Sequence, residues 1–224
     1  MKRIAILFLA IVFSLTLFGC TQSNTPSEET SLPIQTIDPC EITYAKPVIY
    51  LYPEAETEVS VNLNFNGRIT SSYPVYRNGW RVLAHPDGTL IDPETGREYY
   101  CLFWEGDGEN SYDLTTGFVV PGSETAAFLE NTLAQMGLSP REANEFLIYW
   151  LPQMETNSYN LISFQNEAYA EKVEFSIQPT PDSVLRVFMV WKELDEPIAI
   201  APQTFNTFER DGFTVVEWGG ACIG

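Results

Sequence analysis

The sequence predicts an α+β fold. We expect a mainly antiparallel β-sheet system, a sandwich being one arrangement, with a two-helix hairpin over residues 123–151 packed on it. Three observations lead to this. Short apolar or alternating runs fill most of the chain, Asn-Gly and Asp-Gly dipeptides separate several of them, and only two segments have helical periodicity.

The strands differ in how their apolar residues are spaced. The run 48–52 is continuously apolar, which is typical of a strand buried on both faces, whereas 58–65 alternates and indicates a half-exposed strand. The run 184–191 is the longest and is expected to be central. Further strands are expected at 81–84, 90–91, 99–104, 117–120, 173–177 and 213–218.

The helices have the clearest boundary signals. Ser123 is expected to cap a helix that runs to Met136, and Gly137 then supplies a left-handed ending. The second helix begins with a capping box over residues 139–142 that has proline at its first position. We expect Pro152 to end it, because proline disfavours helix at the preceding residue.

The N-terminus resembles a bacterial lipoprotein signal. A short basic start precedes an apolar run at 4–18, which is too short to span a membrane but typical of a secretory signal. It ends in Leu-Phe-Gly-Cys, a pattern similar to the lipobox, so residues 1–19 are expected to be cleaved and Cys20 to be lipidated. An ordinary cleaved signal is the alternative. Residues 20–39 then form a lipidated, disordered tether to a single globular domain, 40–224.

Charge and composition restrict the partners. The chain has 30 acidic and 12 basic residues, and cleavage of residues 1–19 would change the formal charge from −18 to −20. This acidity argues against nucleic acid and favours projection away from an anionic membrane. One histidine cannot build a multi-histidine metal site, and no phosphate-binding motif is present, so we expect no cofactor or metal. Carboxylates at 107–113 offer oxygen ligands without EF-hand spacing, which favours an acidic surface turn over a calcium loop.

The remaining cysteines suggest a structural bridge. Cys40 opens the folded region and Cys222 nearly closes it, and domain termini are often close in space, so we expect a Cys40–Cys222 disulfide. Cys101 lies in an apolar run and is expected to be a small buried hydrophobe rather than a nucleophile. His85, the one available base, precedes a Pro-Asp-Gly turn.

Several short segments carry a family resemblance. They are Lys46–Pro53 (KPVIYLYP), Leu102–Gly106 (LFWEG), Tyr149–Pro152 (YWLP), Arg186–Val190 (RVFMV) and Glu217–Gly220 (EWGG). Together they resemble an uncharacterised family of bacterial extracytoplasmic proteins and lipoproteins, across nearly all of the folded region. The resemblance implies one compact domain and no established activity.

Paired carboxylates are the main catalytic hypothesis. Glu105 and Glu217 both lie in aromatic strand ends, where burial raises a carboxyl pKa, and Glu145 is a third candidate. Arg186 shares a strand face with apolar residues, so its guanidinium must find a carboxylate, with Glu217 expected first and Glu105 second. A structural ion pair is the alternative to a catalytic site.

Three functions therefore remain open. The first is a lipid-anchored, extracytoplasmic binding module held at the cell membrane or outer membrane, whose partner is an envelope protein or a wall glycan. Tyr73, Tyr76 and Trp80, in a turn-rich segment, are its expected aromatic contacts, with Arg186 as a further binding residue. The second is a glycan-active hydrolase that uses Glu105 and Glu217. The third is a spacer without a specific ligand.

Overall fold

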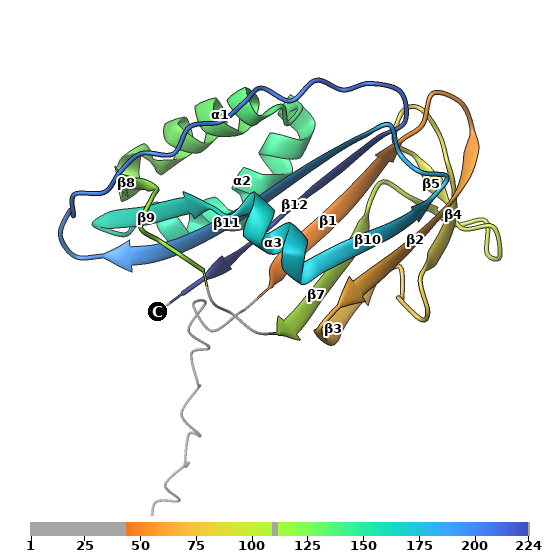
Figure 1. The fold of residues 1–224 in the computed structure, drawn as a ribbon, viewed down its shortest axis with the longest axis horizontal. Helices are drawn as coiled ribbons and strands as arrows, with labels where there is room; N and C mark the ends of the chain where they lie inside the picture. Colours follow the sequence, from red (N-terminus) through yellow and green to blue (C-terminus); the bar gives the residue numbers. More distant parts are fainter. Residues whose placement is uncertain (1–43, 109–111, 224) are drawn as a thin grey trace, which may run out of the picture. The chain divides into compact units, whose positions relative to one another are not determined.

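The structure is a computed structural model that describes residues 44–108 and 112–223 (Figure 1). These residues belong to one compact unit, Ile37–Gly224. The signal peptide, Cys20, the tether and Cys40 lie outside the described residues, so those expectations stay predictions. In the part of the chain that is described, no helix has the length and apolar character needed to cross a membrane.

Two β-sheets dominate the fold, as the sequence predicted. The larger has seven strands in the order β3-β7-β1-β12-β11-β9-β8, and the smaller has five in the order β10-β2-β4-β5-β6. The seven strands are β3 (Gly67–Tyr73), β7 (Leu102–Gly108), β1 (Ala45–Tyr52), β12 (Thr214–Cys222), β11 (Ser183–Leu194), β9 (Tyr159–Phe164) and β8 (Phe118–Pro121). The five are β10 (Val173–Gln178), β2 (Thr57–Phe65), β4 (Trp80–Ala84), β5 (Leu90–Ile91) and β6 (Glu98–Tyr99).

The seven-stranded sheet forms the middle of three layers. The helices α1 (Thr125–Met136) and α2 (Pro140–Met154) cover one face, and the five-stranded sheet with the short helix α3 (Asn166–Lys172) covers the other. Because side chains alternate along a strand, Val48 and Tyr50 of β1 contact the helices, whereas Ile49 and Leu51 contact the second sheet. This is why the run 48–52 is apolar throughout.

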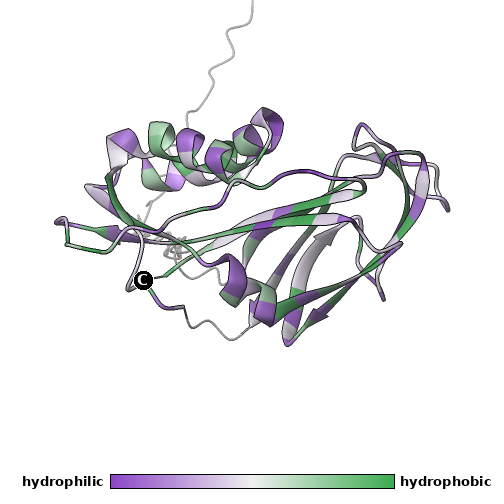
Figure 2. Ribbon diagram, turned by 45° about the horizontal axis from the view of Figure 1, so that its top comes forward, coloured by the Kyte–Doolittle hydropathy of each residue, from purple (hydrophilic) through white to green (hydrophobic). Residues whose placement is uncertain are grey.

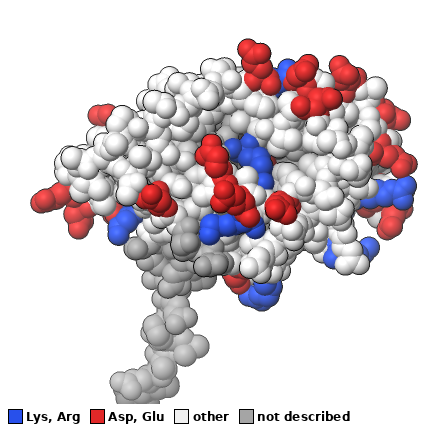
Figure 3. All heavy atoms as spheres, in the orientation of Figure 1, with Lys and Arg blue, Asp and Glu red and all other residues white. Residues whose placement is uncertain are grey.

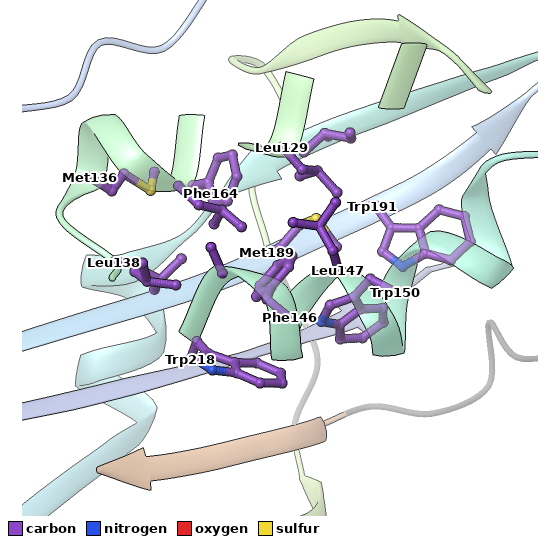
Figure 4. Close-up of a cluster of buried hydrophobic side chains, with 14 of the residues drawn as sticks. Leu129, Met136, Leu138, Phe146, Leu147, Trp150, Phe164, Met189, Trp191 and Trp218 are labelled. Carbon is purple, nitrogen blue, oxygen red and sulfur yellow. The ribbon is translucent and has the colours of Figure 1, made fainter. Parts of the chain in front are cut away.

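The helix side of the sheet holds a large aromatic core. Figure 4 shows the side chains that meet there, among them Leu129 and Met136 of α1, Phe146 and Trp150 of α2, and Met189, Trp191 and Trp218 of the sheet. Both helices alternate between hydrophilic and hydrophobic residues, so that one stripe of each is buried (Figure 2).

The helix boundaries confirm part of the sequence analysis. Gly137 adopts φ 105°, and the Leu138 amide donates to the Leu133 carbonyl, which is a Schellman ending. The capping box of Ser139 and Glu142 is also present.

Two boundary predictions were wrong. Ser123 lies in a 3-10 turn, Gly122–Glu124, and makes no capping bond to α1. Helix α2 continues through Pro152 to Met154. Proline has no N–H, so the Ile148 carbonyl lacks the hydrogen bond that residue 152 would otherwise donate. Both Pro152 and Ile148 are exposed, so water can bind that carbonyl oxygen instead.

Several features differ from the sequence analysis. Helix α3, strands β3 and β9, and the parallel pairing of β11 with β12 were not expected; the remaining described strand pairs are antiparallel. The single strand expected at 99–104 is wrong, because β6 in the smaller sheet and β7 in the larger sheet divide it. The expected central strand, β11, is the longest at 12 residues, but β12 occupies the middle of the sheet order. The irregular segment 195–213 joins the two parallel strands and passes along the helix side (Figure 1).

Candidate functional site

Glu217 lies in a closed cluster between the two sheets. Its side chain is fully buried. Oε1 accepts hydrogen bonds from the Tyr169 hydroxyl at 2.9 Å and from Trp104 Nε1 at 3.4 Å. Oε2 accepts from Arg186 Nε at 2.8 Å, and Arg186 Nη2 lies 2.7 Å from the same oxygen. The expected ion pair between Arg186 and Glu217 is therefore present.

The Arg186 guanidinium makes further contacts, although its buried Nη2 has the ion-pair contact alone and no hydrogen bond. Nη1 donates to the Val173 carbonyl, and the guanidinium carbon lies 4.0 Å from the Phe175 ring centroid and 4.6 Å from that of Tyr169. Burial lowers the pKa of an arginine, but Glu217 outweighs this and keeps the Arg186 pKa raised. The cluster links β7, β10, β11, β12 and α3, so its geometry fits a contact that sets the register between layers.

Glu105 does not join this cluster. On β7 it follows Trp104, which donates to Glu217, so strand alternation places Glu105 on the opposite, helix-facing side of the seven-stranded sheet. The structure therefore does not bring Glu105 and Glu217 together, and the expected two-carboxylate pair is not formed. The sequence placed each acid at an aromatic strand end, but it did not give the sheet register that decides which face each one occupies.

Glu105 instead belongs to a half-buried group beside helix α2. It accepts a hydrogen bond from the Lys46 amide at 3.3 Å, and Lys46 Nζ lies over the rings of Phe103 and Tyr149. Lys46 has φ 60°, a left-handed conformation that is strained for a residue with a side chain. Burial raises the pKa of Glu105, and the Lys46 amide offsets part of this.

Glu145 and Glu142 are also held by protein partners. Glu145 accepts from the Tyr50 hydroxyl at 2.6 Å and lies 3.5 Å from Arg141 Nε. The buried Glu142 accepts from Tyr52 at 2.8 Å and forms an ion pair with Arg210 of the 195–213 segment. Glu142 is therefore closed to a substrate, whereas the Glu145 side chain remains 25% exposed.

The expected aromatic binding face is not assembled. Trp80 is only 4% exposed and donates to the Pro74 carbonyl at 2.7 Å, while Tyr76 packs edge-to-face on it and accepts from the Leu63 amide. Of the three predicted aromatics, Tyr73 alone is well exposed, at 54%. The turn-rich sequence suggested exposure, but these rings fold back onto the second sheet.

The thiol and imidazole candidates show no catalytic arrangement. Burial raises the pKa of Cys101 to about 12, which disfavours the thiolate form that a nucleophile needs. His85 lies in a turn, with Nδ1 3.6 Å from Glu56. In the described residues no three His, Cys, Asp or Glu side chains converge as a metal site. Residues 109–111 of the acidic loop fall outside that description, and Cys222 is buried at the end of β12.

A shallow groove at the edge of the seven-stranded sheet is a further candidate site. Its volume is about 760 Å³, compared with about 410 Å³ for the hollow beside Trp80. Strand β8 forms its floor, and α1 and the 195–213 segment form its walls. The lining side chains are mostly apolar and include Phe118, Val119, Phe128, Ile198, Ile200 and Pro202.

Sequence reasoning missed this groove because two stretches distant in the sequence, 117–131 and 198–202, build it. The one local signal is the short apolar run Ile198–Ala201 after an acidic turn, in which Ile198 is 50% exposed. An exposed apolar residue by itself is common on protein surfaces.

The comparisons with known proteins give one partial relative. No family model and no solved structure matches the chain. A segment of 65 residues is 45% identical to a Butyrivibrio fibrisolvens protein described as "Uncharacterized protein in bglA 3'region". The match covers 28% of this chain and 66% of that protein, which is just under two thirds of its length.

Proposed function

We propose that this protein is a lipid-anchored, extracytoplasmic binding module of the cell envelope that engages a partner protein without chemical turnover. The observation that carries this proposal is the open apolar groove at β8, combined with the burial of Glu217 against Arg186 on the sheet face opposite Glu105. A groove with apolar walls and few charges is suited to binding.

The hydrolase alternative has less support. A glycosidase needs two carboxyl groups on the same side of a cleft, about 5 to 10 Å apart. Glu105 and Glu217 face opposite sides of one sheet, and Glu217 has no exposed surface. Glycan stacking is also less favoured, since Trp80 and Tyr76 pack against the protein.

Lipid anchoring at Cys20 is the second part of the proposal. It predicts that the full chain, expressed in bacteria fed an alkyne analogue of palmitate, takes up the label and sediments with membranes. Cys20→Ser should lose both properties, whereas the matched change Cys101→Ser should keep them. Labelling of Cys20→Ser at the wild-type level would refute the anchor.

Binding and turnover are separated by two assays on the full chain. Detergent-solubilised protein is first incubated with insoluble wall glycan, and we expect neither co-sedimentation nor released sugar; release would overturn the binding proposal in favour of a hydrolase. A photoreactive amino acid is then placed at Ile198 or at Ile148, which is 75% exposed on α2. We expect a discrete protein adduct in intact cells from position 198 only. Equal yields from both positions, or none, would favour a spacer.

A further inference from the structure

Strand β8 leaves one backbone edge free. It ends the seven-stranded sheet and pairs with β9 on one side. On the other side, the 195–213 segment pairs with the chain just before β8, where the Gly117 amide donates to the Ala201 carbonyl at 2.9 Å. This bridge is parallel, so residues 202–206 are the ones that continue beside β8. Among the described residues, no backbone hydrogen bond joins Phe118–Pro121 to residues 198–206.

The direction of the open groups follows from this bond. The Gly117 N–H points away from β9, and alternate residues of a strand point their N–H and C=O the same way. The N–H and C=O of Val119 are therefore expected to face the groove. Pro121 has no N–H, so β8 offers a short hydrogen-bonding edge of about 13 Å.

The walls of the groove suit the side chains of an extended chain. Phe128 and Ala127 of α1 line it together with Ile198 and Ile200 of the 195–213 segment. An added strand would direct alternate side chains to these walls. The edge offers N–H and C=O groups at the spacing of a β-strand. A peptide backbone has matching groups at that spacing, whereas a lipid or a sugar does not.

The charges around the groove favour a basic partner. Glu124 is the one charged residue in the lining, and no Lys or Arg belongs to it. Asp195 and Glu196 directly precede the lining residues of the 195–213 segment. In Figure 3 the surface over α1 and this segment is mostly uncharged, with acidic residues at its margins. A cationic flank on a bound peptide would therefore be attracted.

We propose that this groove binds an extended segment of a partner protein, with alternating apolar residues and basic flanks, as an added strand on β8. The inference rests on the proposed binding function and specifies its partner. Binding combines backbone hydrogen bonds to β8, apolar contact with Ile198 and Phe128, and attraction between basic flanks and the acidic rim.

The test uses defined octapeptides and the full chain in detergent. The probe is Lys-Lys-Val-Thr-Val-Thr-Lys-Lys, with two controls: the same core with glutamate flanks, and the same peptide N-methylated at alternate core residues. Binding is measured by fluorescence anisotropy at about 50 mM salt. We expect the probe to bind and both controls to bind about tenfold more weakly or worse, because each lacks one of the proposed interactions.

Two matched substitutions locate the binding. Ile198→Gln should weaken probe binding about tenfold, in line with the loss of one buried apolar side chain. Ile148→Gln, at an isoleucine outside the groove, should change it less than about twofold. Amide exchange at Val119 should slow when the probe is bound.

Four results would overturn the inference. They are absence of probe binding, equal binding of the N-methylated peptide, equal effects of the two substitutions, and a self-associated chain that Ile198→Gln converts to monomer. The last result would assign the groove to a second copy. If the probe fails but the cross-link from position 198 in cells persists, strand addition is wrong while the binding function stands.

Discussion

At the scale of single residues, the Glu217 carboxylate is fully buried and is held by three side chains. Its two oxygens accept three hydrogen bonds, Arg186 Nη2 lies within ion-pair distance of one of them, and no solvent reaches the group. A buried carboxylate that loses its cation is costly, because the remaining charge stays out of water. The ion pair between Arg186 and Glu217 therefore contributes more to the selection of a single packing arrangement than to the net free energy of unfolding.

This constraint makes a first prediction. Arg186→Met should lower the free energy of unfolding by about 3 to 5 kcal/mol, since it leaves Glu217 charged and buried without its cation. The double change Arg186→Met with Glu217→Leu should recover most of the loss. Arg81→Met, at an exposed ion pair with Glu58, should leave stability essentially unchanged. Urea unfolding measures all three, and a double variant no more stable than Arg186→Met alone would contradict the account.

Glu142 predicts how stability depends on pH. Burial by itself raises the pKa of Glu142, but hydrogen bonds from Arg210, the Ser139 amide and Tyr52 outweigh it and hold the pKa below its usual value. As pH falls, Glu142 is therefore protonated in the unfolded chain before it is protonated in the folded chain. The ionised carboxylate contributes to the free energy of unfolding above about pH 4.3, and this contribution is lost as pH falls through the folded-state pKa.

The corresponding measurement is urea unfolding between about pH 3 and pH 7. The free energy of unfolding should be higher for the wild type than for Glu142→Gln. This difference should be largest at about pH 6 to 7 and should shrink below about pH 4.3. Glu130→Gln, at an exposed position of α1, serves as the control and should show no such trend. A Glu142→Gln difference that persists unchanged to pH 3 would be inconsistent with the lowered pKa.

At the scale of elements, the tight turn between α1 and α2 positions the whole helical layer. Gly137 has φ 105°, and a Cβ added there would lie 3.0 Å from Phe208 Cβ in the 195–213 segment. Both the backbone conformation and the space require glycine. This turn therefore ties the helix hairpin to the segment that also walls the β8 groove.

We expect Gly137→Ala to destabilise the fold by about 1 to 3 kcal/mol, through a strained left-handed alanine and displacement of Phe208. Gly96→Ala is the matched control. Gly96 has φ 67°, but a Cβ there meets nothing within 4 Å, so only the conformational part of the loss should remain. Thermal or urea unfolding of both variants tests this, and equal losses would show that contact with Phe208 is unimportant.

At the scale of the whole molecule, the sheet register brings the two ends of the fold together. Ala45, near the start of β1, pairs with Gly220 of β12, two residues before Cys222. Cys40 is five residues upstream of Ala45, a short enough distance along the chain to reach Cys222. The expected Cys40–Cys222 bridge would then close most of the chain into one loop.

The bridge makes a prediction about stability. In the chain-entropy treatment, so long a loop contributes up to about 5 kcal/mol, and less if the unfolded chain is compact. Non-reducing peptide mapping should find Cys40 joined to Cys222, and Cys222→Ser should unfold at lower urea concentration. Cys101→Ser should have a much smaller effect. A free Cys40 in oxidised, folded protein would exclude the bridge.

The local sequence determined those features that depend on neighbouring residues. These are the helix hairpin with its capping box and its Gly137 ending, the doubly buried run 48–52, and the need of Arg186 for a carboxylate partner. Helix periodicity, strand alternation and the cost of an unpaired charge all act over a few residues, so the printed sequence was sufficient.

Only the tertiary structure decided the rest. Which face Glu105 and Glu217 occupy depends on strand register, and the burial of Trp80 depends on the Pro74 carbonyl across a turn. The β8 groove requires an edge strand, a helix and the 195–213 segment to meet. Such arrangements follow from contacts between residues far apart in the chain, which local periodicity does not encode.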